Sequence, residues 1–382
     1  MSIADSTDPP AFSRPIWAEI DLVALRSNFE TLVALSGGGM IAVIKANAYG
    51  HGAVAAARAL CTGAKRPAML AVASVDEGLE LRGAGIASPI LLLSAILPSE
   101  ANAAVRAGLT PTVFSVEVAE ALDAAGCAEG RIAEAHFKID TGMARLGAPH
   151  EEAVELWKSC HVFPNLAISG VYTHFACADD EDDTMTAGQL SAFREFLGAC
   201  GIDSSGSRVM VHAANSAARL RYPEARFAMA RCGISLYGAS PSPYSNPFGV
   251  PLQPVMALRA RIVHVRSVQA GTSVSYGATW RADRDSRIAT IPVGYADGYP
   301  RSLSNRGQVL VRGQRCPVVG RVTMDITLVD ITDAGEGIDV GETVTVWGSG
   351  LPAEEVASWA GTIPYEIFTG VAARVPRVYS DA

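Results

Sequence analysis

Short apolar runs alternate with Ala-, Leu- and Glu-rich stretches over the first two thirds of the chain. Eight such runs follow one another, at residues 40–46, 68–74, 90–94, 111–115, 135–140, 168–174, 209–215 and 228–234. The stretches between them, such as 74–85 and 115–126, have the apolar spacing of amphipathic helices. This alternation predicts an α/β fold with parallel strands, and eight repeats predict a closed (β/α)8 TIM barrel. An open doubly wound sheet is the alternative, weakened because no GxGxxG motif follows the first run.

The pattern changes near residue 240. A Pro- and Ser-rich connector at 239–254 is followed by alternating, β-branched segments that Gly, Asp and Asn separate. These segments predict a mostly antiparallel β domain of about 120 residues. The chain is therefore expected to divide into three parts: a flexible tail at 1–13, the barrel at 14–243 and a β-strand-rich domain at 244–382.

Charge and cysteine usage exclude several classes of function. The 31 Lys and Arg against 39 Asp and Glu give a net charge of −8, and no basic block occurs, so neither nucleic acid nor an anionic membrane is an expected partner. The longest apolar run, 90–97, is far shorter than the ~20 residues of a membrane span. The seven cysteines form no CxxC pair, which argues against disulfides and a metal site. Because the first residues also lack the apolar core of a secretory signal, we expect a cytoplasmic protein.

Candidate catalytic groups follow the predicted strands, because barrel enzymes place them at the carboxyl ends of their strands. The first run ends in Lys45, where lost solvation would free a nucleophilic amine; a lysine that reaches out to solvent is the plain alternative. The fifth run contains Lys138 and leads to Arg145, which could hold a carboxylate or a phenolate, or form a surface ion pair. The sixth run ends in His174, a candidate acid or base and otherwise an ordinary loop histidine.

The last two strand ends indicate a phosphate site. The seventh run leads to Asn215 and Ser216 at the start of a helix, and the eighth leads through Arg231 to Gly233 and Ile234. Loops at these positions of a barrel often bind phosphate with backbone N–H groups, although a helix cap and a turn glycine would give the same residues. A reactive lysine facing a phosphate site suggests pyridoxal 5'-phosphate, an aldehyde that bonds to lysine and withdraws electrons.

Beyond these residues, the sequence resembles the alanine racemase family, the fold-type III pyridoxal-phosphate enzymes. The motifs that carry the resemblance occur in family order between residues 17 and 379: AVIKANAYGHG, HFKIDTGMARLG, HAANSAA, MARCGISLYG, VSYGATW, PVGYADGYPR, GRVTMDI and PYEIFTGVAARVPRVY. The resemblance implies interconversion of L-alanine and D-alanine. This reaction would either supply D-alanine for peptidoglycan or serve the breakdown of D-alanine. One departure is Thr323, where many relatives have cysteine.

The resemblance also implies a role for each site residue. Lys45 would hold the cofactor and act as the base on one face of the substrate, with Tyr276 as the second base on the opposite face. Arg231 would face the pyridine nitrogen and, because it keeps its proton, leave that ring unprotonated. The residues implied to contact the cofactor are Lys45, Tyr49, His174, Asn215, Ser216, Arg231, Gly233, Ile234 and Tyr365.

The substrate would meet a second group of residues. Arg145 and the Met324 backbone N–H would bind its carboxylate, and Tyr295 would narrow the entrance to favour a methyl side chain. Lys138 matches a position that is carbamylated in some relatives, where the modified side chain would brace Arg145. The resemblance implies a head-to-tail homodimer in which Tyr276 and its neighbours reach the partner's barrel.

Three other functions compete with this interpretation. A barrel-type decarboxylase of basic amino acids should carry a carboxylate where this chain has Arg231, and a thiol where it has Tyr276. A protein that only binds pyridoxal phosphate would leave the β domain unexplained. A serine or broad-specificity racemase is the nearest rival; secreted versions of it carry signal peptides, and we expect none here.

Overall fold

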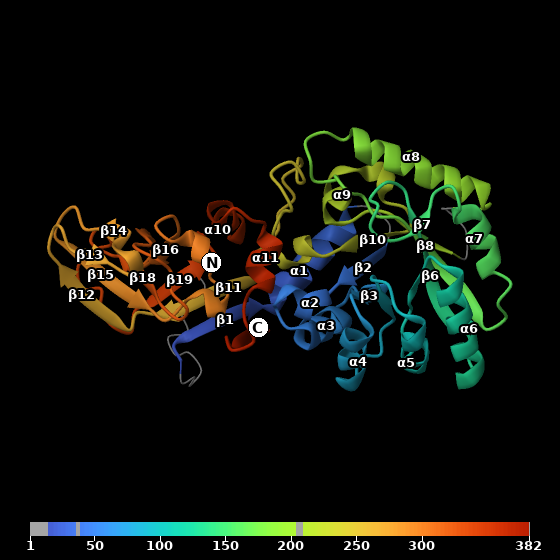
Figure 1. The fold of residues 1–382 in the computed structure, drawn as a ribbon, viewed down its shortest axis with the longest axis horizontal. Coiled ribbons are helices and arrows are strands. Elements are labelled where there is room, and N and C mark those ends of the chain that lie inside the picture. The colour runs from blue at the N-terminus through green and yellow to red at the C-terminus, as the bar shows by residue number, and fades with distance from the viewer. Residues whose placement is uncertain (1–13, 36–38, 204–208, 382) are drawn as a thin grey trace. The chain divides into compact units, whose positions relative to one another are not determined.

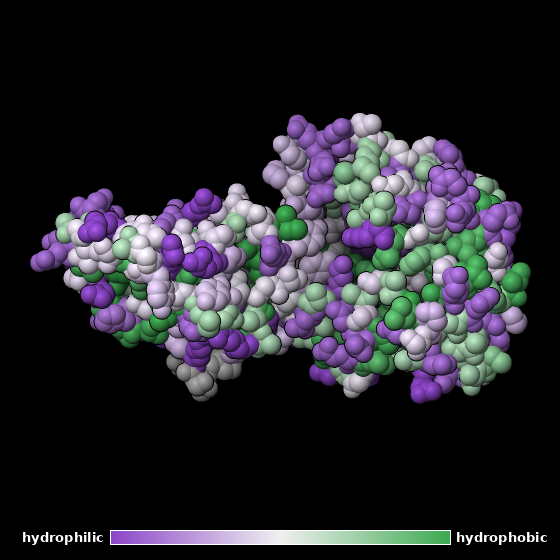
Figure 2. Space-filling model, in the orientation of Figure 1, coloured by the Kyte–Doolittle hydropathy of each residue, from purple (hydrophilic) through white to green (hydrophobic). Residues whose placement is uncertain are grey.

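A computed structural model describes residues 14–35, 39–203 and 209–381. The expected tail at 1–13 lies outside the described residues. The chain divides into two compact units, Leu25–Gln253 and a second unit formed by residues 1–24 together with Pro254–Ala382. In the described part, no helix is long and apolar enough to cross a membrane. Polar and apolar residues are interspersed on the visible face of each unit (Figure 2), as is usual because polar groups cannot cover a folded surface.

The first unit is built on a nearly closed parallel barrel. Its eight main strands, among the described residues, run in the order β4-β3-β2-β10-β9-β8-β6-β5, and a bridge between Leu91 and Thr110 links β4 to the entry of β5. Each lies on one of the eight apolar runs, which confirms the predicted (β/α)8 fold. The strands are β2 Gly39–Val43, β3 Met69–Val72, β4 Ile90–Leu92, β5 Thr112–Val113, β6 Ala133–Asp140, β8 Leu166–Tyr172, β9 Met210–His212 and β10 Met229–Cys232, with the short β7 Ala148–Pro149 beside β6.

Helices surround these strands (Figure 1). Two of them, α4 and α6, begin where the sequence pattern predicted helices. Ser74 caps α4 by accepting a hydrogen bond from the N–H of Glu77, and Ser115 caps α6 by accepting from the N–H of Val118. The helices of the unit are α1 Leu22–Ala34, α2 Lys45–Tyr49, α3 Ala53–Thr62, α4 Val75–Gly83, α5 Ala101–Arg106, α6 Val116–Glu129, α7 Ala153–Cys160, α8 Thr184–Ala199 and α9 Ser216–Arg221, with single 3-10 turns η1 Pro98–Glu100, η2 Pro223–Ala225 and η3 Ile234–Tyr237.

The second unit is mostly β structure, as predicted. A six-stranded sheet has the order β17-β16-β19-β11-β1-β20, and a three-stranded sheet has the order β12-β15-β18. The bounds are β1 Ile16–Asp21, β11 Met256–Arg261, β12 His264–Val268, β13 Ser273–Val274, β14 Trp280–Arg281, β15 Ser286–Ile291, β16 Gln308–Val311, β17 Gln314–Pro317, β18 Thr327–Asp330, β19 Thr343–Trp347 and β20 Arg377–Ser380. Among its described residues, two helices and three 3-10 turns accompany the strands: α10 Ala353–Ala360, α11 Pro364–Thr369, η4 Tyr276–Ala278, η5 Tyr295–Asp297 and η6 Arg301–Leu303.

Strand β1 differs from the sequence expectation, which assigned all of 14–243 to the barrel. β1 pairs antiparallel with β11 and parallel with β20, so it belongs to the six-stranded sheet. Its partners lie more than 200 residues away along the chain, and a local hydrophobic pattern does not reveal such a pairing. The described part of the chain therefore contributes β1 to the β unit, then forms the barrel, and then supplies the other strands of the β unit.

Candidate active site

Lys45 is the second residue after β2, at the carboxyl end of that strand, and it begins α2. Its side chain is half-buried. Burial lowers the pKa of Lys45, the positive charge of Arg145 lowers it further, and Glu77 opposes the shift. A lysine with a lowered pKa holds a larger fraction of neutral amine near neutral pH, and the neutral amine is the nucleophile and the base.

A left-handed turn follows Lys45. Residues 46–49 all have φ between 52° and 54°, although none is a glycine. Such a conformation costs roughly 1–2 kcal/mol per residue, so neighbouring groups must hold it. The N–H of Ala46 donates to Glu77 Oε1 (2.7 Å), and Asn47 Oδ1 accepts from the first N–H of α3 (2.7 Å). The turn brings Tyr49 back into the barrel, where it is buried.

Tyr49 packs against a cradle of backbone and hydroxyl groups at the ends of β9 and β10. A Cβ atom on Gly233 would lie 2.3 Å from the Tyr49 hydroxyl oxygen, so only glycine fits there. The Gly233 N–H donates to Ser216 Oγ (2.9 Å), and Asn215 Oδ1 caps α9. Ile234 follows, fully buried. The structure thus brings together Tyr49, Asn215, Ser216, Gly233 and Ile234, and their role in binding a phosphate stays a prediction.

Arg231 is the most heavily bonded side chain of the site. Its Nη1 donates to His212 Nδ1 (2.7 Å) and to the His212 carbonyl (3.1 Å). Its Nη2 meets His174 Nδ1 (3.0 Å) and the carbonyls of Thr173 (2.7 Å) and Ala213 (2.9 Å). Burial lowers the pKa of Arg231 to about 10, so the group remains a cation at neutral pH.

His174 is neutral. Burial and the neighbouring Arg231 hold the pKa of His174 well below its ordinary range. Because the guanidinium can only donate, His174 Nδ1 must accept, and its proton lies on Nε2. His174 therefore offers an Nε2–H donor beyond Arg231.

Lys138 and Arg145 make this barrel end strongly positive. Lys138 is buried on β6, with its Nζ 5.5 Å from the centre of the Tyr172 ring. Burial lowers the pKa of Lys138 to about 8, and the charges of Arg231 and Arg145 contribute. Arg145 is exposed in the loop after β6 and acts on both Lys45 and Lys138. Four cationic side chains near one another suit an anionic ligand.

The remaining predicted residues lie in the β unit. Tyr276, Tyr295 and Met324 are exposed, with 73%, 44% and 53% of their surface accessible. The segments that carry Tyr295 and Met324 lie side by side, because the N–H of Tyr295 donates to the Thr323 carbonyl (3.0 Å) and the N–H of Ala296 to the Met324 carbonyl (3.0 Å). Tyr365 lies in the first turn of α11. Their relation to the barrel residues stays a prediction.

Sequence reasoning missed two buried histidines and one glutamate. His136 on β6 and His212 on β9 form a hydrogen bond inside the barrel (2.9 Å) and lead to Arg231. The available signal was a histidine within each of two apolar runs that end in site residues. Glu77, which supports the turn after Lys45, gives no such signal, because an acidic residue in the first turn of a helix is ordinary.

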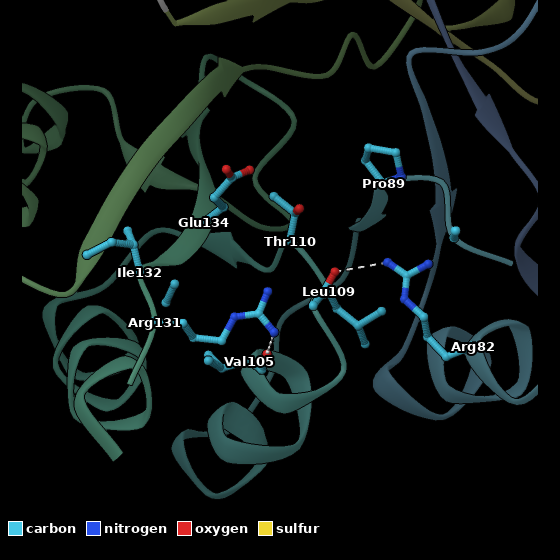
Figure 3. Close-up of a pocket in the computed structure, with 11 residues that line it drawn as sticks. Arg82, Pro89, Val105, Leu109, Thr110, Arg131, Ile132 and Glu134 are labelled. Atoms are coloured by element: carbon cyan, nitrogen blue, oxygen red, sulfur yellow. Dashed lines mark hydrogen bonds between the residues drawn. The ribbon is translucent and has the colours of Figure 1, made fainter. Parts of the chain in front are cut away.

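A pocket of about 250 Å³ lies at the opposite end of the barrel (Figure 3). Arg82 and Arg131 approach it from two sides, near the residues where β4, β5 and β6 begin. The Arg82 guanidinium donates to four backbone carbonyls, at 2.6–2.9 Å, and so joins the loops that enter the strands. The amino-terminal end of a barrel commonly serves stability, and this pocket does not include Lys45 or Arg231.

Comparison with known proteins agrees with this geometry. Residues 20–241 match the alanine racemase N-terminal domain, and residues 255–379 match the alanine racemase C-terminal domain. The alanine racemase of Desulforamulus reducens is 45% identical over 370 residues, 96% of this chain and 99% of the relative. That of Desulfovibrio desulfuricans is 44% identical, with 97% and 100% of the two chains covered.

Solved structures give the same result. The alanine racemase of Clostridium difficile 630 superposes with a TM-score of 0.91 at 36% identity, over 97% of this chain and 96% of that one. The enzyme from a D-cycloserine-producing Streptomyces lavendulae gives 0.90 at 37% identity, over 98% of both chains. The resemblance seen in the motifs is confirmed across both units, and the chain belongs to the alanine racemase family of isomerases.

Proposed function

We propose that this chain interconverts L-alanine and D-alanine with pyridoxal 5'-phosphate as its cofactor, using Lys45 and Tyr276 as two bases. The observation that carries the proposal is the amine of Lys45. Burial lowers its pKa, and it stands at the same barrel end as the Gly233 cradle and Arg231. The bound cofactor would withdraw electrons from the substrate's α-carbon and make its proton removable.

The residues of the barrel end fit the cofactor's phosphate. Substituting any side chain at Gly233 would fill the space beside the Tyr49 hydroxyl, so the backbone there can approach a ligand closely. Burial raises the pKa of Tyr49, which keeps its hydroxyl protonated. Ser216 and Asn215 stand at the start of α9, and Ile234 begins η3. With Tyr365, these residues would hold the phosphate, as the family resemblance implies.

Arg231 fits the ring nitrogen of the cofactor. A guanidinium has five N–H groups and no acceptor. Five acceptors surround the four N–H groups of Nη1 and Nη2, whereas Nε–H meets none within the described part of the chain. Nε–H is thus the donor left for a pyridine nitrogen. Because arginine does not give up its proton, that nitrogen would stay unprotonated.

Racemisation needs one group on each face of the substrate's α-carbon, one to remove a proton and one to return it. Lys45 Nζ, with its lowered pKa, takes or gives the proton on one face. The phenol of Tyr276, which is exposed in the β unit, serves the other face. A head-to-tail homodimer would bring the partner's Tyr276 to Lys45, with the His174 Nε2–H as its neighbour.

Substrate recognition falls to charged and backbone groups. Arg145 and the Met324 N–H, which has no partner among the described residues, would hold the carboxylate, and Tyr295 would narrow the entrance. Lys138, whose pKa burial lowers to about 8, has enough neutral amine to take up carbon dioxide. The resulting carbamate would carry a negative charge to brace Arg145. We place the enzyme in the cytoplasm, where it supplies D-alanine for peptidoglycan or takes part in the breakdown of D-alanine.

Chiral chromatography of a panel of amino acids tests this function. The purified protein, loaded with pyridoxal phosphate, should convert L-alanine to an equal mixture of both enantiomers and act far more slowly on L-serine. The Lys45→Ala variant is the control for activity from contaminating enzymes. Faster conversion of serine would assign the chain to another racemase, and release of carbon dioxide from L-lysine would indicate a decarboxylase.

A further inference from the structure

Two histidines inside the barrel form a hydrogen-bonded chain that leads to Arg231. His136 and His212 are almost completely inaccessible to solvent, at 1% and 0% exposure, and His136 Nδ1 lies 2.9 Å from His212 Nε2. The ring of Tyr172 stacks on His212, with centroids 4.7 Å apart and an interplanar angle of 11°. Neither histidine has a role in the proposed reaction, although buried polar groups are costly unless they are fully bonded.

Arg231 fixes the direction of the hydrogen bonds in this chain. Because the guanidinium only donates, His212 Nδ1, at 2.7 Å from Arg231 Nη1, must be unprotonated. His212 therefore carries its proton on Nε2 and donates it to His136 Nδ1. His136 in turn carries its own proton on Nε2.

The opposite arrangement is unfavourable. If His136 donated from Nδ1, His212 would need its proton on Nδ1, where it would face a guanidinium N–H at 2.7 Å. Double protonation is opposed as well, because burial and the charge of Arg231 lower the pKa of both histidines, that of His136 to about 3. Arg231 thus remains the one cation of this three-residue chain.

Packing holds the far end of the chain in place. His136 on β6 is the register partner of Gly170 on β8. A Cβ atom at residue 170 would lie 2.5 Å from His136 Nε2, so the imidazole rests directly on the backbone of the neighbouring strand. The ring of His136 therefore has a fixed position from which its Nδ1 can accept.

We propose that His136 is a positioning residue for Arg231. His136 accepts a hydrogen bond from the Nε2–H of His212. This bond favours the His212 tautomer whose Nδ1 is unprotonated and accepts from Arg231 Nη1. The guanidinium of Arg231 is thereby held in an orientation in which its Nε–H has no partner among the described residues. The inference deepens the proposed function, in which that N–H meets the cofactor's ring nitrogen.

Two substitutions of nearly equal size separate this role from simple packing. His136→Asn keeps an oxygen acceptor near the position of Nδ1, whereas His136→Leu has the same shape without an acceptor. His264→Asn, on exposed β12, is the control for loss of any histidine. Nitrogen-15 NMR of histidine-labelled, full-length protein, with and without pyridoxal phosphate, reads the tautomers directly.

The expected result is an Nε2–H tautomer for both His136 and His212 in the wild-type protein. His212 keeps that tautomer in the Asn and His264 variants and becomes a mixture in the Leu variant. With cofactor, His136→Leu should lower kcat for alanine about tenfold with little change in KM, the size of a lost buried hydrogen bond, and shift the cofactor's absorbance. His136→Asn should stay within about twofold of wild type.

Two results would overturn the inference. One is a wild-type spectrum in which His136 carries its proton on Nδ1, a measurement that decides the matter even if the Leu variant does not fold. The other is a folded Leu variant whose His212 tautomer, absorbance and kcat equal those of wild type. Protein that shows the expected tautomers but takes up no cofactor would support the histidine chain and refute the proposed function.

Discussion

At the scale of single residues, burial and neighbouring cations together lower the pKa of the two lysines of the site. Arg145 lowers the pKa of Lys45, and Arg231, Arg145 and Lys45 all lower that of Lys138. Glu77 opposes the shift of Lys45, and Asp140 opposes that of Lys138. The cost of crowding these charges is offset when an anion binds, which is why a phosphate-bearing cofactor and a carboxylate substrate suit the site.

Arg145→Gln tests this coupling. Removing the positive charge lets the pKa of Lys45 rise, so a smaller fraction of its amine is neutral at a given pH. The pH dependence of cofactor uptake, followed by absorbance, should therefore move to higher pH. Arg145→Lys keeps the charge and should leave the profile in place. An unchanged profile in both variants would show that Arg145 does not act on Lys45.

At the scale of elements, the turn after Lys45 is the feature that sequence patterns least predict. The eight barrel strands follow from hydrophobic runs, and the chemistry at their ends follows from barrel geometry. Four successive left-handed residues do not, because L-residues avoid that conformation. Side-chain contacts from Glu77 and Asn47 support it in addition to the turn's own backbone hydrogen bonds, and the sequence pattern does not reveal them. The pairing of β1 was missed for a related reason, since its partners are distant in sequence.

Substitutions in the turn should change stability in opposite directions. Ala46→Gly, at an exposed position with φ 52°, removes the Cβ penalty and should raise the free energy of unfolding by up to about 1 kcal/mol. Asn47→Ala removes a residue that tolerates the left-handed conformation and the side-chain oxygen that accepts from the first N–H of α3. It should lower the free energy of unfolding by about 1–2 kcal/mol. Chemical denaturation measures both. Equal effects of the two variants would contradict the strained turn.

The buried histidines of β6 and β9 should make folding sensitive to acid. Their folded-state pKa values lie below the ordinary value, so the unfolded chain binds more protons once the pH falls below about 6.5. Each should then cost up to about 1.4 kcal/mol of stability per pH unit. The measurement is the free energy of unfolding between pH 7 and 5, where His136→Asn should have a shallower slope than wild type. Identical slopes would contradict the neutral, buried state of His136.

At the scale of the whole molecule, the proposed bases come from different units. Lys45 belongs to the barrel, whereas Tyr276, Tyr295 and Met324 are exposed on the β unit. A tyrosine as exposed as Tyr276 is unusual as a catalytic group unless another protein surface covers it. A head-to-tail dimer with the partner's Tyr276 over Lys45 would supply that cover twice, once at each site.

Mixing two inactive variants tests the shared site. Lys45→Ala and Tyr276→Phe should each be nearly inactive alone. If the sites are shared, random exchange of subunits makes half the dimers mixed, each with one intact site, and restores about a quarter of wild-type activity. Activity that stays absent after exchange, with mixed dimers shown by mass spectrometry, would place both bases within one chain.

The most direct test of the account is to identify the amine that holds the cofactor. The protein is loaded with pyridoxal phosphate, reduced with borohydride, digested and mapped by mass spectrometry, with Lys45→Arg as the control. We predict that the label lies on Lys45 and is absent from the control. Labelling of Lys138 or another lysine in the wild-type protein, or none at all, would contradict the central claim.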